Sequence, residues 1–144
     1  MRLDKPTGRL QLSATDLANF LSCRHRTALE MGNARGKFSK PAATNARLKA
    51  LFKRGLDHED AYVKELTATP GTVVVQIKSA DAKEPREEAI ARTMDAMRSG
   101  ADVIVQGALS LVNDYRWFGF ADVLIKVQAP ESFGPWSYEV LDTK

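Results

Sequence analysis

Apolar residues recur at helical spacing in three segments, which predicts helices over residues 14–31, 43–67 and 85–98. Ser13, followed three residues later by Asp16, is a favourable cap for the first helix. The residues expected to face the core are Leu17, Phe20, Leu21 and Leu29 in the first helix, Leu48, Phe52, Val63 and Leu66 in the second, and Ala89, Ile90, Met94 and Met97 in the third.

Short runs rich in β-branched and aromatic residues predict strands between and after these helices. They cover residues 72–77, 102–112, 116–127 and 136–143, with a shorter strand at 9–12. The last two are separated by turn-forming residues and are expected to pair as an antiparallel hairpin. The order of elements indicates an α/β fold of the mixed α+β kind, with a mixed central sheet flanked by helices.

The length of 144 residues suits one domain with its own core, which we expect over residues 13–144 after an N-terminal arm at 1–12. The sequence stops at the end of a predicted strand, with no closing helix to cover the sheet. We therefore expect this domain to be truncated on its C-terminal side and to belong to a longer protein.

The composition is that of an ordinary globular protein, with 44% hydrophobic and 27% charged residues. No apolar run approaches the roughly 20 residues of a membrane span, and the N-terminus lacks the apolar core of a signal peptide. We therefore expect a cytoplasmic protein without membrane contact. Cys23 is the single cysteine, which excludes a disulfide within the chain. A net charge of +3 is compatible with a polyanionic partner but does not by itself indicate one.

Two acids and a lysine stand on the predicted hairpin, in a pattern that favours a metal site. Asp142 and Lys144 are two residues apart, so they share one face of their strand. If the hairpin turns about Ser132, Asp122 lies opposite Asp142, with Cβ atoms about 4.5–5.5 Å apart. Two such carboxylates repel unless they share a cation, and oxygen ligands favour Mg²⁺ or Mn²⁺. The alternative is a cross-strand set of salt bridges on a solvated face, although Asp122 lies among apolar residues and needs a partner.

A histidine on the second predicted helix is a candidate third ligand. His58 belongs to a stripe with Leu51, Gly55 and Tyr62, so we expect it to point inward or toward a groove. The alternative is a core histidine with its hydrogen bonds satisfied. Glu59 is expected on a solvated face, although it could also reach the metal site.

These residues resemble the signature of the RecB-like PD-(D/E)XK nucleases. The matching motifs are Gly55-Leu56-Asp57-His58, Gly119-Phe120-Ala121-Asp122 and Asp142-Thr143-Lys144, on a helix and two strands. The resemblance covers about residues 13–144 and implies a restriction-endonuclease-like core. It implies that His58, Asp122, Asp142 and the Thr143 carbonyl bind Mg²⁺ or Mn²⁺, with Lys144 as the catalytic lysine. The gap between the acids is longer than in compact sites of this family, so the hairpin must be extended.

The resemblance extends to the segment that leads to Cys23. In some family members a cysteine at this place is the first ligand of a 4Fe–4S cluster. The alternative is a small buried hydrophobe. Gln106 is a polar residue in an apolar strand, which would line the cleft beside the metal site or bond at a strand edge.

Basic residues concentrate between positions 24 and 54, where Glu30 is the one acid. Such a segment can attract a phosphate backbone, and the alternative is a solvated face on two helices. The residues expected to bind DNA are Arg24, Arg26, Lys37, Arg47, Lys53 and Arg54.

The sequence thus predicts a metal-dependent DNA nuclease that hydrolyses phosphodiesters in repair, recombination or defence. By resemblance, its substrate is single-stranded DNA or DNA with free ends, and a helicase domain lies in the same chain or in a partner chain. The alternative is a catalytically inactive nucleic-acid-binding or scaffolding module of the same fold. An enzyme acting on a small molecule is a weaker option, because no phosphate loop or nucleophile elbow is present.

Overall fold

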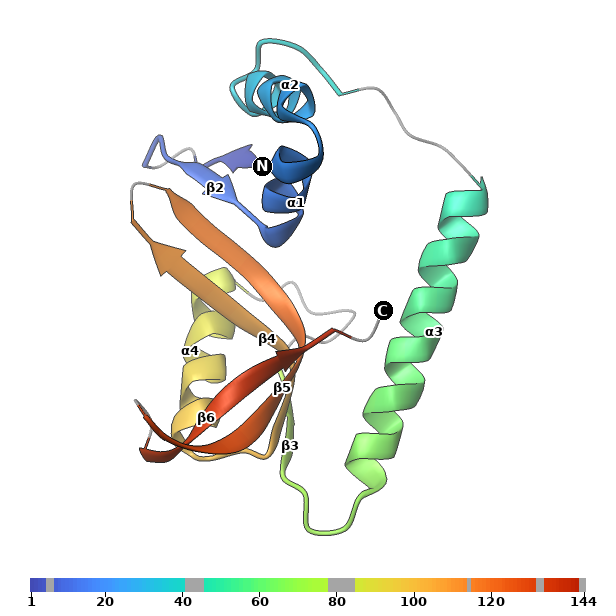
Figure 1. The fold of residues 1–144 in the computed structure, drawn as a ribbon, viewed down its shortest axis with the longest axis vertical. Coiled ribbons are helices and arrows are strands. Elements are labelled where there is room, and N and C mark those ends of the chain that lie inside the picture. The colour runs from blue at the N-terminus through green and yellow to red at the C-terminus, as the bar shows by residue number, and fades with distance from the viewer. Residues whose placement is uncertain (5–6, 41–45, 78–84, 114, 132–133, 143–144) are drawn as a thin grey trace. The chain divides into compact units, whose positions relative to one another are not determined.

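The computed structural model describes residues 1–4, 7–40, 46–77, 85–113, 115–131 and 134–142. This part of the chain forms four helices and six strands, a mixed α/β protein (Figure 1). The helices are α1 (Ala14–Ser22), α2 (Arg24–Ala34), α3 (Ala46–Ala68) and α4 (Arg86–Arg98). The strands are β1 (Arg2–Leu3), β2 (Leu10–Leu12), β3 (Val74–Gln76), β4 (Val103–Val112), β5 (Arg116–Glu131) and β6 (Gly134–Leu141).

The six strands form one mixed sheet in the order β1-β2-β5-β4-β3, and β6 pairs with β5. The pairs β1–β2 and β5–β6 are antiparallel, whereas β2–β5 and β3–β4 are parallel. The predicted mixed sheet with an antiparallel hairpin is therefore confirmed. The arm at residues 1–12 contributes two of the strands, and its β2 pairs in parallel with the start of β5.

The chain divides into two compact units. Unit 1 comprises Met1–Thr44 and Ser110–Gly119, and unit 2 comprises Asn45–Leu109 and Phe120–Lys144. In unit 2, α3 and α4 lie on opposite faces of the sheet. Residues Tyr62, Val63 and Leu66 of α3 pack on a cluster formed by Val103, Val105 and Val123.

The opposite face of the sheet in unit 2 carries Leu124, which packs toward α4. A Cβ added at Gly107 would come within 2.6 Å of the Leu124 side chain and 3.5 Å of Thr93. Thr93 is fully buried, and its hydroxyl donates to the Ala89 carbonyl at 2.8 Å and accepts the Ala108 N–H at 2.9 Å. This hydroxyl joins α4 to β4 because it satisfies a backbone donor that water cannot reach.

The C-terminus of α4 is closed by a glycine and by two side chains of β6. Gly100 has φ 74°, its N–H bonds the Met97 carbonyl, and the Ala101 N–H bonds the Ala96 carbonyl. These bonds form a Schellman motif, in which glycine is favoured because other residues are strained at this φ. The Trp136 indole donates to the Met97 carbonyl at 3.0 Å, and the Tyr138 hydroxyl donates to the Ala101 carbonyl at 2.7 Å. The hairpin thus satisfies carbonyls that the helix end leaves open.

The prediction of one helix over residues 14–31 is wrong, because the chain forms two helices, α1 and α2, that are separated at Cys23. Its backbone is extended, with φ −159° and ψ 105°, and its N–H bonds the Asn19 carbonyl to end α1. The apolar spacing continues across this break, which is why the pattern alone predicted one helix over 14–31. Cys23 is exposed, so the expectation of a small buried hydrophobe is wrong.

The cap predicted at the start of α1 is confirmed and extends into a buried polar cluster. The N–H and the hydroxyl of Ser13 donate to Asp16 Oδ2 at 2.9 and 2.8 Å, and the Met1 amine donates to Oδ1 at 2.7 Å. Asp16 is only 7% exposed. Burial opposes its ionisation, but the bonds from Met1 and Ser13 outweigh burial and hold the pKa of Asp16 below its usual value.

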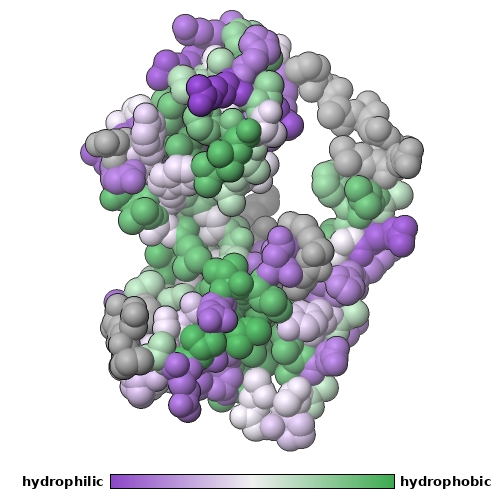
Figure 2. Space-filling view, in the orientation of Figure 1, coloured by the Kyte–Doolittle hydropathy of each residue, from purple (hydrophilic) through white to green (hydrophobic). Residues whose placement is uncertain are grey.

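The predicted core residues are confirmed in part. Ala89 and Met97 of α4 are buried, and Val63 and Leu66 of α3 pack on the core. The predicted stripe of the first helix is wrong, because all four of its residues are exposed, namely Leu17, Phe20, Leu21 and Leu29. Phe52 of α3, which was also expected in the core, is exposed as well. Figure 2 shows such hydrophobic surface as green atoms between hydrophilic ones. In the part of the chain described, no helix combines the length and the apolar character that crossing a membrane requires.

Candidate active site

The register of the β5–β6 hairpin bears on the predicted opposition of the two aspartates. It pairs Val123 with Leu141 and Leu124 with Val140, and it continues to Gln128 and Trp136. Asp122 and Asp142 each lie one residue beyond the Val123–Leu141 pair, so the same register, continued by one step, would place them opposite each other. The predicted fold about Ser132 is thus confirmed for the hairpin itself, because opposed residue numbers average to 132. β5 runs to Glu131, so the hairpin is also extended, as the long gap between the acids requires.

Alternation along the two strands shows which face of the sheet carries the aspartates. Asp122 shares its side of β5 with Leu124 and Lys126, which lie toward α4. Asp142 directly follows β6, which ends at Leu141, and strand alternation continued by one residue assigns it to the side of Tyr138, whose hydroxyl bonds the end of α4. On this alternation both aspartates belong to the α4 face of the sheet.

His58 stands on α3, the helix that covers the other face of the sheet (Figure 1). Its side chain is exposed, so the expectation that it points inward or toward a groove is wrong. The inward residues of this part of α3 are Glu59, Tyr62 and Val63. The helix is rotated so that Glu59, one residue further on, takes the place that the pattern predicted for the histidine. The structure does not bring His58 to the two aspartates.

Glu59 and Gln106 were each candidates from the sequence, and the structure joins them by a hydrogen bond. The Gln106 amide donates to Glu59 Oε1 across the interface between β4 and α3. Gln106 has φ 53°, the one positive φ at a non-glycine residue in the part of the chain described. A backbone in this region costs of the order of 1–3 kcal/mol and persists only where surrounding contacts impose it. The bond to Glu59 is one such contact, so Gln106 is an interior amide and not one that bonds at a strand edge.

Thr143 and Lys144 lie outside the described residues, so the structure says nothing of the predicted carbonyl ligand or the predicted catalytic lysine. Over the described ranges, no three His, Cys, Asp or Glu side chains gather in a group that could hold a metal ion. Two opposed carboxylates do fit a hard divalent cation that retains several waters, since such a cation needs few protein ligands.

Electrostatics on the α4 face are dominated by an ion pair between Lys126 and Asp102. The Lys126 ammonium also donates to the Gly100 carbonyl at 2.8 Å. The bond from Lys126, aided by the Val73 N–H, holds the pKa of the Asp102 carboxyl below its usual value. Burial, and then the negative charge of Asp102, raises the pKa of Tyr138. Because the Lys126 ammonium is bonded to Asp102 and to the Gly100 carbonyl, Lys126 does not replace Lys144 as the predicted catalytic lysine.

The residues predicted to bind DNA fall into both units. In unit 1, Arg24 and Lys37 line one groove beside α2, and Arg26 lines a second groove with Glu30 and Lys40. In unit 2, Lys53 pairs with Asp57 at 3.0 Å and Arg54 is exposed. The side chain of Arg47 lies outside the described part of α3.

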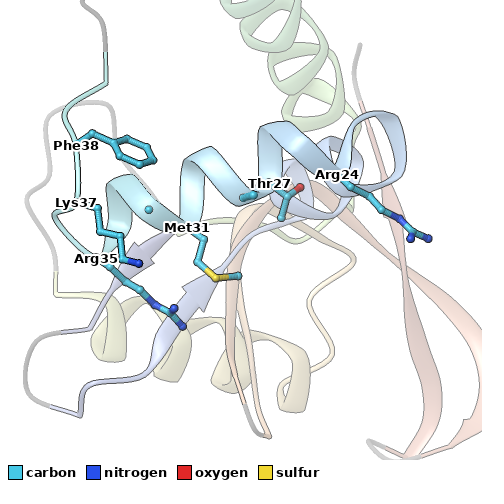
Figure 3. A pocket seen from close by; sticks show the side chains of 8 residues that line it. Arg24, Thr27, Met31, Arg35, Lys37 and Phe38 are labelled. Atoms are coloured by element: carbon cyan, nitrogen blue, oxygen red, sulfur yellow. The ribbon is translucent and has the colours of Figure 1, made fainter.

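The structure adds residues to the first groove that sequence reasoning did not assign, namely Thr27, Arg35 and Phe38 (Figure 3). The spacing of Arg24, Met31 and Arg35, seven and four residues apart, places them on one helical face. That spacing was readable in the sequence, but the position of Phe38 was not.

Comparison with known protein families, with curated proteins and with solved structures finds no match for this chain.

Proposed function

We propose that this protein is a metal-dependent DNA nuclease of the RecB-like type, with a restriction-endonuclease-like core. The observation that carries the proposal is the hairpin register, which leads one step beyond the Val123–Leu141 pair to Asp122 and Asp142. The ordered motifs around Gly55, Gly119 and Lys144 supply the family resemblance.

The chemistry follows from two carboxylates held side by side. Their mutual repulsion raises the cost of ionising both, which makes the pair a strong binder of a divalent cation. Mg²⁺ or Mn²⁺ held there would polarise a phosphate oxygen and supply a hydroxide nucleophile near neutral pH. Lys144 stands beside Asp142 in sequence, and its ammonium would stabilise negative charge on the phosphoryl group. The Asp122 and Asp142 carboxylates orient that centre because opposed strand positions fix their separation.

The test is degradation of end-labelled single-stranded DNA in the presence of Mg²⁺ or Mn²⁺, with EDTA as the blank. Asp142→Asn keeps the size of the side chain but removes its charge, so we expect activity to fall at least about a hundredfold. Glu139→Gln is the matched control, because Glu139 is also an exposed acid of β6 but stands on the alternate side of the strand. Equal rates for the two variants, or no activity in the parent with either metal, would contradict the proposal.

A non-catalytic nucleic-acid-binding module is the second candidate. It is favoured by the position of His58, which is exposed on the helix that covers the face opposite the aspartates. Calorimetric titration with Mn²⁺ separates the two candidates. The nuclease requires Mn²⁺ binding that is lost in Asp122→Asn, whereas a scaffold binds DNA equally well with and without this substitution and takes up no Mn²⁺.

A further inference from the structure

A groove beside α2 combines cations with a seated aromatic ring. It has a volume of about 410 Å³ and is lined by Arg24, Thr27, Ala28, Met31, Gly32, Arg35, Lys37 and Phe38 (Figure 3). Arg24 and Arg35 are eleven residues apart, so they span about 16 Å along the helix axis. A groove of this length can contact more than one phosphate of an extended strand. The lining contains three cations and no acid.

The acids near this groove are already engaged elsewhere. Glu30 pairs with Lys40 at 2.7 Å, and Asp16 is bonded to Met1 and Ser13. Arg24 lies over the Phe20 ring at 5.6 Å from its centroid, a contact that leaves its charge unneutralised. Unit 1 contains nine Lys and Arg against four Asp and Glu, a net charge of +5, although the whole chain carries only +3. This half of the protein therefore attracts polyanions more strongly than the overall charge suggests.

Phe38 is held at the groove as a rigid platform. Its ring lies so close to Gly32 that a Cβ there would come within 2.7 Å of Phe38 Cε1. The Asn33 amide donates to the Phe38 carbonyl at 2.9 Å, and the Lys37 N–H bonds the Gly32 carbonyl at 2.9 Å. Phe38 is 47% exposed, and it lines both this groove and the second groove, which Arg26, Glu30 and Lys40 also line. A fixed, half-exposed aromatic among cations is the arrangement on which unpaired bases stack.

Thr27 adds a polar group to the same lining. Its Oγ1 is shielded from solvent and has no hydrogen-bond partner among the described residues. A helical threonine commonly bonds the carbonyl four residues earlier, but Thr27 does not, so its hydroxyl is an unpaired polar group in the groove lining. The surface over α2 is largely hydrophilic in Figure 2, which fits a charged ligand better than an apolar partner.

We propose that this groove binds single-stranded nucleic acid, with bases stacked on Phe38 and the phosphate backbone held by Arg24, Arg35 and Lys37. Stacking requires an unpaired base, so the groove selects single strands over duplexes. The inference rests on the proposed function only for the choice of DNA as the ligand. Binding itself requires neither Asp122 nor Asp142, and it occurs without a divalent metal.

The experiment measures binding of a fluorescent oligo-dT by anisotropy in EDTA, using the full chain and a duplex of equal length for comparison. Phe38→Leu keeps an apolar side chain against Gly32 but removes the ring, and we expect about a 5-fold to 150-fold rise in Kd for oligo-dT. Phe38→Trp is expected to restore the affinity. The double variant Arg35→Gln/Lys37→Gln lowers the slope of log K against log salt by about 1.4, because two cations no longer displace counterions.

Lys40→Gln is the matched control for charge. Lys40 follows Phe38 by two residues but pairs with Glu30, so its removal changes net charge without touching the groove. We expect less than about a twofold change in Kd. Circular dichroism of each variant verifies that the helices remain.

Three results would overturn the inference. They are unchanged oligo-dT affinity in both Phe38→Leu and the double variant, equal affinity for the duplex, and preferential binding to anionic lipid vesicles. These outcomes are separable from failure of the nuclease proposal. A protein that degrades DNA but ignores Phe38→Leu refutes only the groove, whereas one that binds through Phe38 but never degrades DNA refutes only the nuclease.

Discussion

The two units of this protein are organised by different forces. Among the residues that the structure describes, unit 2 holds nearly all of the buried apolar side chains, including Ile104, Val123 and Leu124, whereas unit 1 contributes Leu10 and Phe118. Unit 1 carries a net charge of +5 and unit 2 a net charge of −2. In unit 1 the best-defined interior contact is polar, between Asp16, Ser13 and the Met1 amine.

This difference suits the two units to the separate tasks proposed for them. A packed apolar core holds strands in a fixed register, which the proposed metal site at the end of the hairpin requires. A small basic unit with exposed helices suits the proposed binding of a polyanion, because it needs little core to present cations. The contrast predicts that volume changes damage unit 2, whereas loss of charge at one carboxylate damages unit 1.

The largest expected effect is loss of a core side chain in unit 2. Leu124 is 1% exposed and packs beside Gly107, so Leu124→Ala should lower the free energy of unfolding by about 2–5 kcal/mol. The same substitution at Leu21, which is 76% exposed, should change it by less than about 0.5 kcal/mol. Urea unfolding followed by Trp136 fluorescence in a Trp117→Phe background measures unit 2, and Trp117 fluorescence in a Trp136→Phe background measures unit 1. An equal loss of unfolding free energy in Leu124→Ala and Leu21→Ala would contradict the prediction, because it would mean that Leu21 is packed in an apolar core.

A smaller effect is expected from the buried carboxylate of unit 1. The folded-state pKa of Asp16 is lowered, so its contribution is complete above the unfolded pKa of about 3.9 and is lost as pH falls further. Asp16→Asn should cost about 1–3 kcal/mol at neutral pH and should flatten this acid dependence. Hydrogen exchange of α1 amides between pH 3 and 7 measures both.

Asp95→Asn is the control for this prediction, because Asp95 is an exposed acid of α4 in unit 2. Its substitution should leave the exchange of α1 amides unchanged. If Asp16→Asn retained the full acid dependence of the parent, another carboxylate would be responsible and the polar account of unit 1 would fail.

The smallest effect is expected at the corner where β6 meets α4. Tyr138→Phe removes the bond to the Ala101 carbonyl and should cost about 1 kcal/mol. Since the folded-state pKa of Tyr138 is raised, its contribution is complete below the unfolded pKa of about 10 and is lost as pH rises through the folded value. Ultraviolet titration of the phenols, compared with Tyr138→Phe, identifies this group. A phenol that titrates at or below the ordinary value would contradict the burial that raises its pKa.

The register of the hairpin could be predicted from the sequence, whereas the orientation of His58 could not. Asp122 and Asp142 were placed opposite each other from the turn position alone, and the register of Val123 and Leu141 agrees. His58 was placed on the stripe of Leu51, Gly55 and Tyr62, which lies beside the predicted core stripe of α3. Tyr62 of that stripe packs on the sheet together with Val63 and Leu66 of the core stripe, whereas Leu51 is exposed like His58. A helix with two candidate stripes leaves its rotation undecided until its partner is known.

By itself, the sequence determined the local features of this protein. Ser13 and Asp16 cap α1, Gly100 ends α4, and β5 pairs with β6 in a register centred on position 132, because each depends on residues close in the chain. Only the tertiary structure decided the break at Cys23, the exposure of His58, the bond of Gln106 to Glu59 and the contact of Phe38 with Gly32. These features depend on which surfaces pack together, or on local backbone conformations such as the extended Cys23 and the positive φ of Gln106. Hydrophobic periodicity encodes neither.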